Sequence, residues 1–215
     1  MLDALLRRRL DPLLDRLGCS LAARGANANS MSLVGLAVGL AAVPLLAGGR
    51  YGPALAAILL NRVIDGLDGA VARCRGITPF GGYLDIVCDM AFYAAVPVGF
   101  ALADAANALW AALLLASFVC TASSFLGRAV MAEQRGDHSR GPQQRKSFFY
   151  APGLVEGSET ILAFVLFCLL PAWFPSLAAV FAGLCLLTAA ARLLDAYRAF
   201  SREDVVAVAG EPPKS

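Results

Sequence analysis

The chain has 215 residues, of which 59% are hydrophobic and only 16% are charged, and long uncharged runs recur along it. This composition excludes an ordinary soluble domain and predicts an integral membrane protein. The formal net charge of +2 excludes little, because the distribution of charges rather than their sum orients a membrane protein.

The first 25 residues predict an amphipathic helix that lies in the membrane interface. Leucines recur here at helical spacing with arginines between them, which is typical of a helix with one apolar and one basic face. A cleaved signal peptide is the alternative, but no apolar core of about 7–15 residues precedes a small-residue cleavage site. The leucines are Leu2, Leu5, Leu6, Leu10, Leu13, Leu14, Leu17 and Leu21.

Six apolar stretches follow, each near the length of about 20 residues that a bilayer-spanning helix needs, although the fifth is short. Helices satisfy backbone polar groups in lipid without closing a barrel. We therefore expect an all-α membrane protein in which residues 1–215 form one domain, with six transmembrane helices over 31–198 and a tail over 203–215. The stretches are 31–48, 53–72, 83–103, 108–130, 154–170 and 176–198.

Basic residues are concentrated on one side of this predicted bundle. All of the 18 basic residues except Arg50 lie on that side or toward it. Because basic residues favour the cytoplasmic side of a membrane, we expect both termini to be cytoplasmic, in a plasma membrane such as a bacterial inner membrane.

The six cysteines show no CxxC or CxxH spacing, and most of them fall inside apolar stretches, where cysteine behaves as a small hydrophobic residue. We therefore expect neither a disulfide framework nor a zinc site. They are Cys19, Cys74, Cys88, Cys120, Cys168 and Cys185.

Four aspartates lie close together within the apolar sequence, and they form two pairs. Asp65 and Asp68 are three residues apart, and Asp85 and Asp89 are four apart, so each pair shares one face of a helix. The turn RCRGITPFGG between them predicts an antiparallel hairpin that brings the pairs together at the cytoplasmic end. Acids in a membrane require a positive partner, and several carboxylates suit Mg²⁺ or Mn²⁺. Two such ions about 4 Å apart are common in phosphoryl chemistry.

Small residues surround the first pair of aspartates. Gly66, Gly69, Ala70 and Ala72 would let a phosphate group approach the helix, and Arg73 lies one turn beyond Gly69, where its guanidinium could hold phosphate. The alternative is a structural cluster in which the aspartates pair with neighbouring arginines. Those arginines are Arg62, Arg73 and Arg75.

These residues resemble the signature of the class I CDP-alcohol phosphotransferase family at eight positions over 25 residues, without a gap. The matching pattern is Asp65-x2-Asp68-Gly69-x2-Ala72-Arg73-x7-Gly81-x3-Asp85-x3-Asp89. Asn29, followed by Ser30 and Ser32, is similar to the family's Pro-Asn-x-x-Thr/Ser segment, with Ala28 in place of the proline.

The resemblance implies a role for each matched residue. Asp65, Asp68 and Asp85 would be the principal metal ligands, for two ions of Mg²⁺ or Mn²⁺, with Asp89 close to the metals and acting as the general base. The nucleotide and its diphosphate would contact Gly69, Ala72 and Arg73, with Asn29 as a further candidate.

The implied activity is metal-dependent transfer of a phosphatidyl group from CDP-diacylglycerol to a small polar alcohol, with release of CMP, in phospholipid biosynthesis. Transfer of a headgroup from another CDP-alcohol to a lipid hydroxyl is the alternative within the same chemistry. A cation- or proton-coupled transporter is the alternative from a different class. The resemblance also implies a homodimer, and nothing indicates a nucleic-acid partner.

Candidate residues for binding the acceptor alcohol lie in the fourth apolar stretch, in the fifth, and in the connection between them. Arg128 and Lys146 could bind an anionic alcohol, although the positive-inside rule alone explains basic residues there. Glu156 and Glu159 could accept hydrogen bonds from hydroxyls, although carboxylates also favour the N-terminus of a helix.

Overall fold

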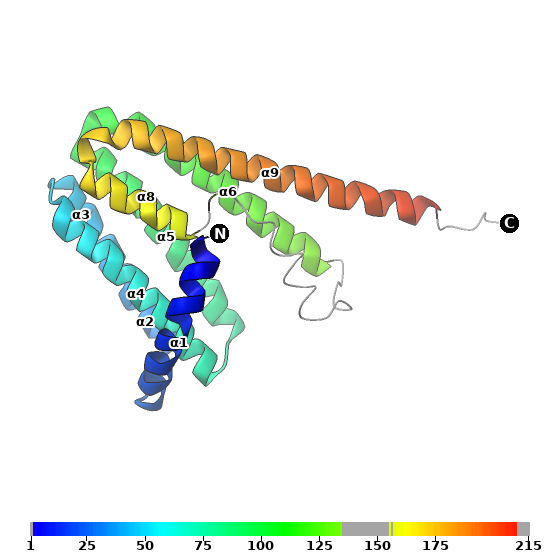
Figure 1. Ribbon diagram of the computed structural model, residues 1–215, viewed down its shortest axis with the longest axis horizontal. Helices are drawn as coiled ribbons and strands as arrows, with labels where there is room; N and C mark the ends of the chain where they lie inside the picture. Colours follow the sequence, from blue (N-terminus) through cyan, green and yellow to red (C-terminus); the bar gives the residue numbers. More distant parts are fainter. Residues whose placement is uncertain (1, 135–154, 156, 210–215) are drawn as a thin grey trace. The chain divides into compact units, whose positions relative to one another are not determined.

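The computed structural model describes residues 2–134, 155 and 157–209, and every regular element in these ranges is a helix. The all-α prediction is therefore confirmed for the described part of the chain. The elements are α1 (Leu2–Ala23), α2 (Ala28–Leu40), α3 (Ala42–Ala47), α4 (Tyr51–Arg75), α5 (Pro79–Ala103), the 3₁₀ helix η1 (Ala105–Asn107), α6 (Ala108–Gln134), α8 (Gly157–Leu169), the 3₁₀ helix η3 (Pro171–Trp173) and α9 (Phe174–Ala209) (Figure 1).

Local signals in the sequence explain the hairpin of α4 and α5. Helix α4 ends at Gly76, whose φ of 106° lies in the left-handed region that glycine adopts without strain. Thr78 then caps α5 by accepting a hydrogen bond from the Gly81 N–H at 3.0 Å, and Pro79 occupies the first turn, where no N–H is needed. The predicted turn between the two pairs of aspartates is therefore short and well defined.

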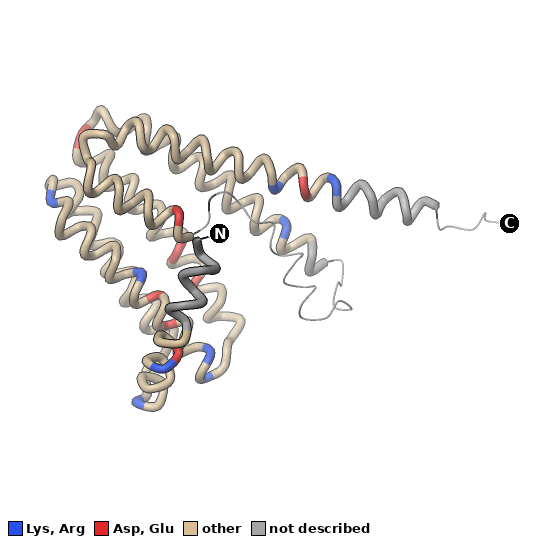
Figure 2. The backbone as a smooth tube through the Cα atoms, in the orientation of Figure 1, with Lys and Arg blue, Asp and Glu red and all other residues tan. Residues whose placement is uncertain are grey.

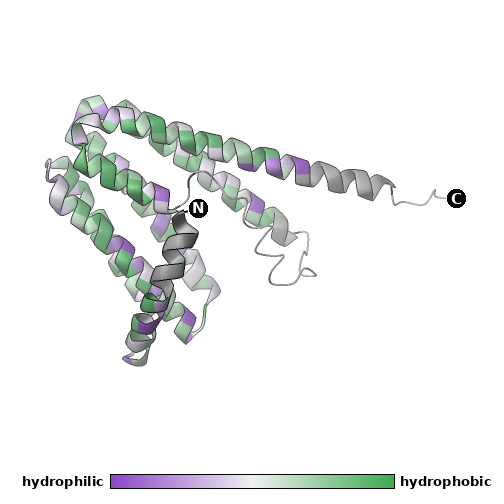
Figure 3. Cartoon of the chain, viewed as in Figure 1, coloured by the Kyte–Doolittle hydropathy of each residue, from purple (hydrophilic) through white to green (hydrophobic). Residues whose placement is uncertain are grey.

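Four helical segments are long and apolar enough to span a membrane, and the chain is an integral membrane protein. They are Ala28–Ala47, Pro79–Ala103, Ala105–Met131 and Pro171–Arg198, and they match four of the six predicted stretches. The stretch 53–72 lies in α4, which has 25 residues but carries several charges in its C-terminal half (Figure 2). The stretch 154–170 corresponds to α8, which is apolar along most of its length but has only 13 residues (Figure 3). A count of six spans stays a prediction.

The chain divides into two compact units. The first contains residues 1–115 and 157–181, and the second contains residues 116–156 and 182–215. Helices α6 and α9 each contribute residues to both units.

The first unit contains α2, α3, α4, α5 and α8 around a core of phenylalanines. Phe100 stacks on Phe174 with 4.4 Å between the ring centroids, and Phe167 meets both rings edge-on. Glycine allows the closest helix approaches, since a Cβ at Gly39 would lie 2.6 Å from Phe92 Cδ2. Aromatic pairs of these geometries each add about 0.5–1.5 kcal/mol beyond burial. This core fixes the end of the hairpin opposite the four aspartates.

The second unit contains the later parts of α6 and α9. Polar side chains link these two helices. Thr121 Oγ1 donates to the Ser117 carbonyl at 2.8 Å and approaches the Cys185 carbonyl at 3.3 Å. Arg192 Nη1 lies 3.4 Å from the Thr121 carbonyl, and its guanidinium lies 5.9 Å from the centroid of Phe125. Hydrogen bonds of this kind commonly join helices in membranes.

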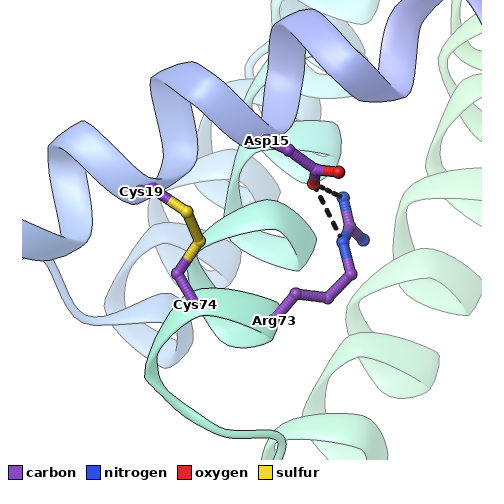
Figure 4. Close-up of a disulfide and its surroundings, with 4 residues drawn as sticks. All are labelled: Asp15, Cys19, Arg73 and Cys74. Carbon is purple, nitrogen blue, oxygen red and sulfur yellow. Dashed lines mark hydrogen bonds and ion pairs between the residues drawn. A yellow bond between two sulfur atoms is a disulfide. The ribbon is translucent and has the colours of Figure 1, made fainter.

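Helix α1 packs against α4 and α8, and a disulfide between Cys19 and Cys74 joins α1 to α4 (Figure 4). The expectation of no disulfide is therefore wrong for this pair. Sequence spacing gave no signal because the two cysteines are 55 residues apart and meet only through the packing of two helices. A cross-link that closes a loop of this size stabilises a fold by about 4 kcal/mol in the chain-entropy model.

Gly18 lies where α1 approaches α4 most closely. A Cβ at Gly18 would lie 2.8 Å from the carbonyl carbon of Ala70 and 3.0 Å from the amide nitrogen of Val71. Because these are backbone atoms, they cannot turn aside. We expect Gly18→Ala to push the helices apart at a cost of roughly 1–3 kcal/mol, which lowers the melting temperature in detergent by roughly 3–10 °C.

The control for this substitution is Gly52→Ala in the first turn of α4, where a Cβ meets no atom within 4 Å. Differential scanning fluorimetry of both purified variants, with the disulfide intact, makes the comparison. A Gly18→Ala variant that melts together with the wild type and the Gly52→Ala variant would contradict the close packing of α1 on α4.

Candidate metal centre

The hairpin of α4 and α5 brings three of the four predicted aspartates together. Three carboxylate oxygens lie within 4.8 Å of one another, one each from Asp65, Asp68 and Asp85. Asp65 and Asp68 share a face of α4 because they are three residues apart, and Asp85 reaches them from the first turns of α5. The predicted convergence of the two pairs is therefore present for these three residues.

Asp68 shows most directly that this cluster suits a cation. Its residue is 4% exposed, and its Oδ2 atom is buried with no hydrogen-bond partner among the described residues. A buried carboxylate oxygen without a partner carries a large desolvation penalty. The three aspartates offer only oxygen ligands, which Mg²⁺ and Mn²⁺ prefer. The residues therefore fit a divalent cation.

Asp89 lies beside the cluster and pairs with an arginine. Arg62 Nη1 donates to Asp89 Oδ1 at 2.9 Å and lies 3.5 Å from Asp65 Oδ2. The ion pairing that the structural alternative expected is thus present for Arg62. Arg73 pairs instead with Asp15 of α1.

Arg75 also turns away from the aspartates. Its Nη1 atom donates to the carbonyls of Gly25 and Ala26, at 3.3 Å and 2.5 Å. It therefore holds the turn between α1 and α2. Of the three arginines considered, Arg62 alone forms an ion pair with the motif aspartates among the described residues.

Arg73, the arginine of the matched pattern, is oriented by α1. Its Nε and Nη2 atoms donate to the same oxygen of Asp15, at 3.0 Å and 2.6 Å (Figure 4). Its Nη1 atom lies near Gly69, 3.5 Å from the position that a Cβ would occupy there. Both side chains of the pair are 47% exposed, and such pairs contribute little stability, about 0–1 kcal/mol. The guanidinium therefore remains accessible to a ligand.

Asn29 and Gly81 of the matched residues also meet. A Cβ at Gly81 would lie 3.1 Å from Asn29 Oδ1 and 2.9 Å from Thr78 Oγ1. Asn29 belongs to the first turn of α2, which is capped by the side chain of Asn27. Gly69 and Ala72 are partly exposed on α4. The candidates for the nucleotide thus lie on α2, on α4 and at the start of α5, all within the first unit.

The candidates for the acceptor are less closely grouped. Glu159 lies in the first turn of α8, where its Oε2 atom accepts a hydrogen bond from Ser158 Oγ at 3.0 Å. Arg128 lies on α6 in the second unit. Lys146 and Glu156 lie outside the described residues.

Two neighbours of the aspartates were missed by the sequence reasoning. Tyr93 lies one turn after Asp89 on α5, and its hydroxyl is 3.4 Å from Arg62 Nη1. Asn61 is buried beside Arg62 and accepts a hydrogen bond from its Nε at 2.8 Å. The spacing of four residues between Asp89 and Tyr93 was a usable signal, whereas nothing in the sequence indicated the role of Asn61.

Comparison with known proteins gives three matches. The sequence model of a family described as CDP-alcohol phosphatidyltransferase matches residues 25–191. The inner membrane protein YnjF of Escherichia coli strain K12 is 48% identical over 198 residues, which cover 92% of this chain and 96% of that protein. Archaetidylinositol phosphate synthase of Pyrococcus horikoshii is 33% identical over 103 residues, which cover 45% of this chain and 52% of that protein.

Proposed function

Because this chain belongs to the CDP-alcohol phosphatidyltransferase family, we propose that it transfers a phosphatidyl group from CDP-diacylglycerol to a small polar alcohol and releases CMP. Family membership makes the protein a membrane-bound transferase. The observation that carries the finer proposal is the cluster of Asp65, Asp68 and Asp85 with its buried Asp68 oxygen, which has no partner among the described residues. Arg73 follows further along the same helix. This is an arrangement suited to a metal-bound diphosphate.

Asp65, Asp68 and Asp85 are the proposed ligands of Mg²⁺ or Mn²⁺, two ions in all, and Asp89 would lie close to them. When bound, the ions supply positive charge that offsets the charge of the diphosphate and of the departing CMP. Arg73 adds a fixed positive charge beside them, and Gly69 and Ala72 keep that side of α4 free of bulky side chains. Asn29 completes the proposed nucleotide site from α2.

Asp89 is the proposed general base. Its free oxygen takes the proton from the hydroxyl of the acceptor, and the hydroxyl oxygen attacks the phosphorus that bears the lipid. A new phosphorus–oxygen bond forms, the phosphoanhydride bond breaks, and CMP leaves with the electron pair of that bond. A base of this kind must lie within hydrogen-bonding reach of the hydroxyl, and Asp89 lies at the edge of the metal cluster.

The acceptor is proposed to be a small polar alcohol, either neutral or phosphorylated. Glu159 on α8 supports recognition of hydroxyl groups, and Arg128, Lys146 and Glu156 remain candidates from the sequence. The Pyrococcus relative is named as a synthase of archaetidylinositol phosphate. Inositol phosphate therefore belongs among the first alcohols to be tested here.

The membrane arrangement is part of the same proposal. We place six helices in the bilayer, so that α4 and α8 join the four apolar spans, with α1 in the interface and the site and both termini on the cytoplasmic side. Helix α4 has 25 residues and would be about 37 Å long at the usual rise, which is enough to cross the hydrocarbon core. A homodimer follows from the family resemblance, and a single domain over residues 1–215 follows from the six helices, which use nearly the whole chain.

Purified full-length protein in detergent tests the reaction. It is incubated with Mg²⁺ or Mn²⁺, labelled CDP-diacylglycerol and a panel of glycerol phosphate, inositol phosphate and neutral polyols. We expect release of CMP that requires both an alcohol and the metal and that stops in EDTA, with the lipid product identified by mass spectrometry.

The same assay separates the alternatives. Release of CMP only from a soluble CDP-alcohol in the presence of diacylglycerol would reverse the proposed direction of transfer. Cation or proton flux in liposomes, without CMP release from either donor, would overturn the proposed function in favour of transport.

A further inference from the structure

Arg62 makes more contacts than an ion pair requires. Its Nε atom donates to Asn61 Oδ1 at 2.8 Å, while Nη1 donates to Asp89 Oδ1 at 2.9 Å and lies 3.4 Å from the Tyr93 hydroxyl. The guanidinium also lies 4.4 Å from the centroid of the Phe92 ring. A guanidinium fixed at several atoms loses little further freedom when it binds a carboxylate.

The groups that hold Arg62 are themselves fixed. Asn61 is 3% exposed and donates from Nδ2 to the carbonyl of Gly35 in α2 at 2.7 Å. Phe92 is fully buried against the Phe164 ring of α8. The side chain of Arg62 is only 15% exposed. A continuous series of contacts therefore runs from the backbone of α2 through Asn61 and Arg62 to Asp89.

This series determines how the carboxylate of Asp89 is presented. Oδ1 is bound to Arg62, whereas Oδ2 has no hydrogen bond within the described ranges of the chain. Asp89 also stands apart from the three-carboxylate cluster, although it lies on the same helix as Asp85. Arg62, which also lies 3.5 Å from Asp65 Oδ2, thus holds one oxygen of Asp89 next to the cluster and leaves the other oxygen for another partner.

We propose that Arg62 is a positioning residue for the transfer reaction: held by Asn61, Tyr93 and Phe92, it binds one oxygen of Asp89 so that the other oxygen faces the acceptor hydroxyl. This inference rests on the proposed function, because it assumes that Asp89 is the base. It adds a residue outside the matched pattern to the site. A simple stabilising ion pair would need neither the bond to Asn61 nor the free oxygen.

Three variants of the full-length protein test the inference. Arg62→Ala removes the guanidinium, Arg62→Lys keeps the charge but cannot bind Asn61 and Asp89 with the same fork, and Arg50→Ala is the matched control. Arg50 is exposed at the other end of the same helix, where its side chain makes no capping bond. CMP release gives kcat and KM for the CDP-linked donor, and electron paramagnetic resonance gives the affinity for Mn²⁺.

We expect Arg62→Ala to lower kcat by about 10²-fold, since a misplaced catalytic group has an effect of this size. The KM for the CDP-linked donor should stay within about threefold of the wild type, and Mn²⁺ should bind no more weakly, because a positive charge next to two aspartates has been removed. Guanidinium added at millimolar concentration should restore part of the activity of Arg62→Ala and none of that of Arg62→Lys. Arg50→Ala should match the wild type.

Wild-type kcat in Arg62→Ala would overturn the inference, as would loss of Mn²⁺ binding in that variant or the absence of rescue by guanidinium. If Arg62→Ala does not fold, as judged by size-exclusion chromatography, Arg62→Lys decides the matter. A wild-type kcat in that variant would also overturn the inference. Failure of the wild-type protein to release CMP would instead overturn the proposed function, so the two failures are distinguishable.

Discussion

The Asp89→Asn variant is expected to release CMP at least about 10³-fold more slowly than the wild type, because asparagine cannot accept the proton of the acceptor hydroxyl. Asparagine has nearly the same shape as aspartate and keeps an oxygen for the hydrogen bond from Arg62 Nη1. The side chain should therefore stay in place while the chemistry is lost. CMP release at saturating alcohol measures the effect.

The affinity for Mn²⁺ shows whether Asp89 acts as base or as ligand. As a base near the metals, Asp89 should be replaceable with a loss of Mn²⁺ affinity of at most about 10–100-fold, the size found for groups that do not bind the metal directly. Full activity in Asp89→Asn would exclude it as the base, and loss of both activity and Mn²⁺ binding would make it a metal ligand instead. Asp195→Asn, which changes an exposed carboxylate of α9 in the second unit, is the matched control.

The Asp68→Asn variant should lose both Mn²⁺ binding and CMP release. Asp68 is the one buried member of the three-carboxylate cluster, and its Oδ2 atom has no hydrogen-bond partner among the described residues. A metal ion contributes several kcal/mol to a reaction of this class, so we expect activity to fall by on the order of 10³-fold or more. Electron paramagnetic resonance and CMP release measure the two losses.

Thermal stability separates this loss from a failure to fold. In EDTA the Asp68→Asn variant should melt at or above the wild-type temperature, because one of several repelling carboxylates is gone. Added Mn²⁺ should raise the melting temperature of the wild type but not that of the variant, since only a bound ligand stabilises the native state. A variant that is stabilised by Mn²⁺ as strongly as the wild type would remove Asp68 from the metal site.

The hairpin and its acidic cluster were predictable because they depend on local spacing. The intervals from Asp65 to Asp68 and from Asp85 to Asp89 each place two carboxylates on one helical face. Gly76 and Thr78 then determine where one helix ends and the next begins. Such features require only the periodicity of a helix and the chemistry of a turn.

Contacts between distant residues were not predictable in the same way. The hydrogen bond from Arg62 to Asp89 joins residues 27 apart, and the pair of Asp15 and Arg73 joins residues 58 apart. Three arginines are near enough in the sequence to pair with the aspartates. Only the packing of the helices shows that Arg62 is the one that does so. The hydrogen bond that Arg62 donates to Asp89, beside the cluster of the other three acids, depends on this packing.

The number of membrane spans exposes another limit. Helix α4 fails a test based on hydropathy because it carries the charged residues of the site, although its 25 residues are long enough. Helix α8 fails because it has only 13 residues. Apolar length alone therefore identifies neither helix as a span, and the count of six stays a prediction.

The disulfide between Cys19 and Cys74 has a topological consequence. It closes the chain from α1 to the end of α4 into a covalent ring, and that ring contains α2, α3 and the first two motif aspartates. A single break of the backbone in the turn between α3 and α4 would leave both ends attached through the sulfur atoms. Asp65 and Asp68 would then still be covalently joined to α1, and Arg73 would stay beside its partner Asp15. Reduction of the disulfide would be needed before the two pieces could separate.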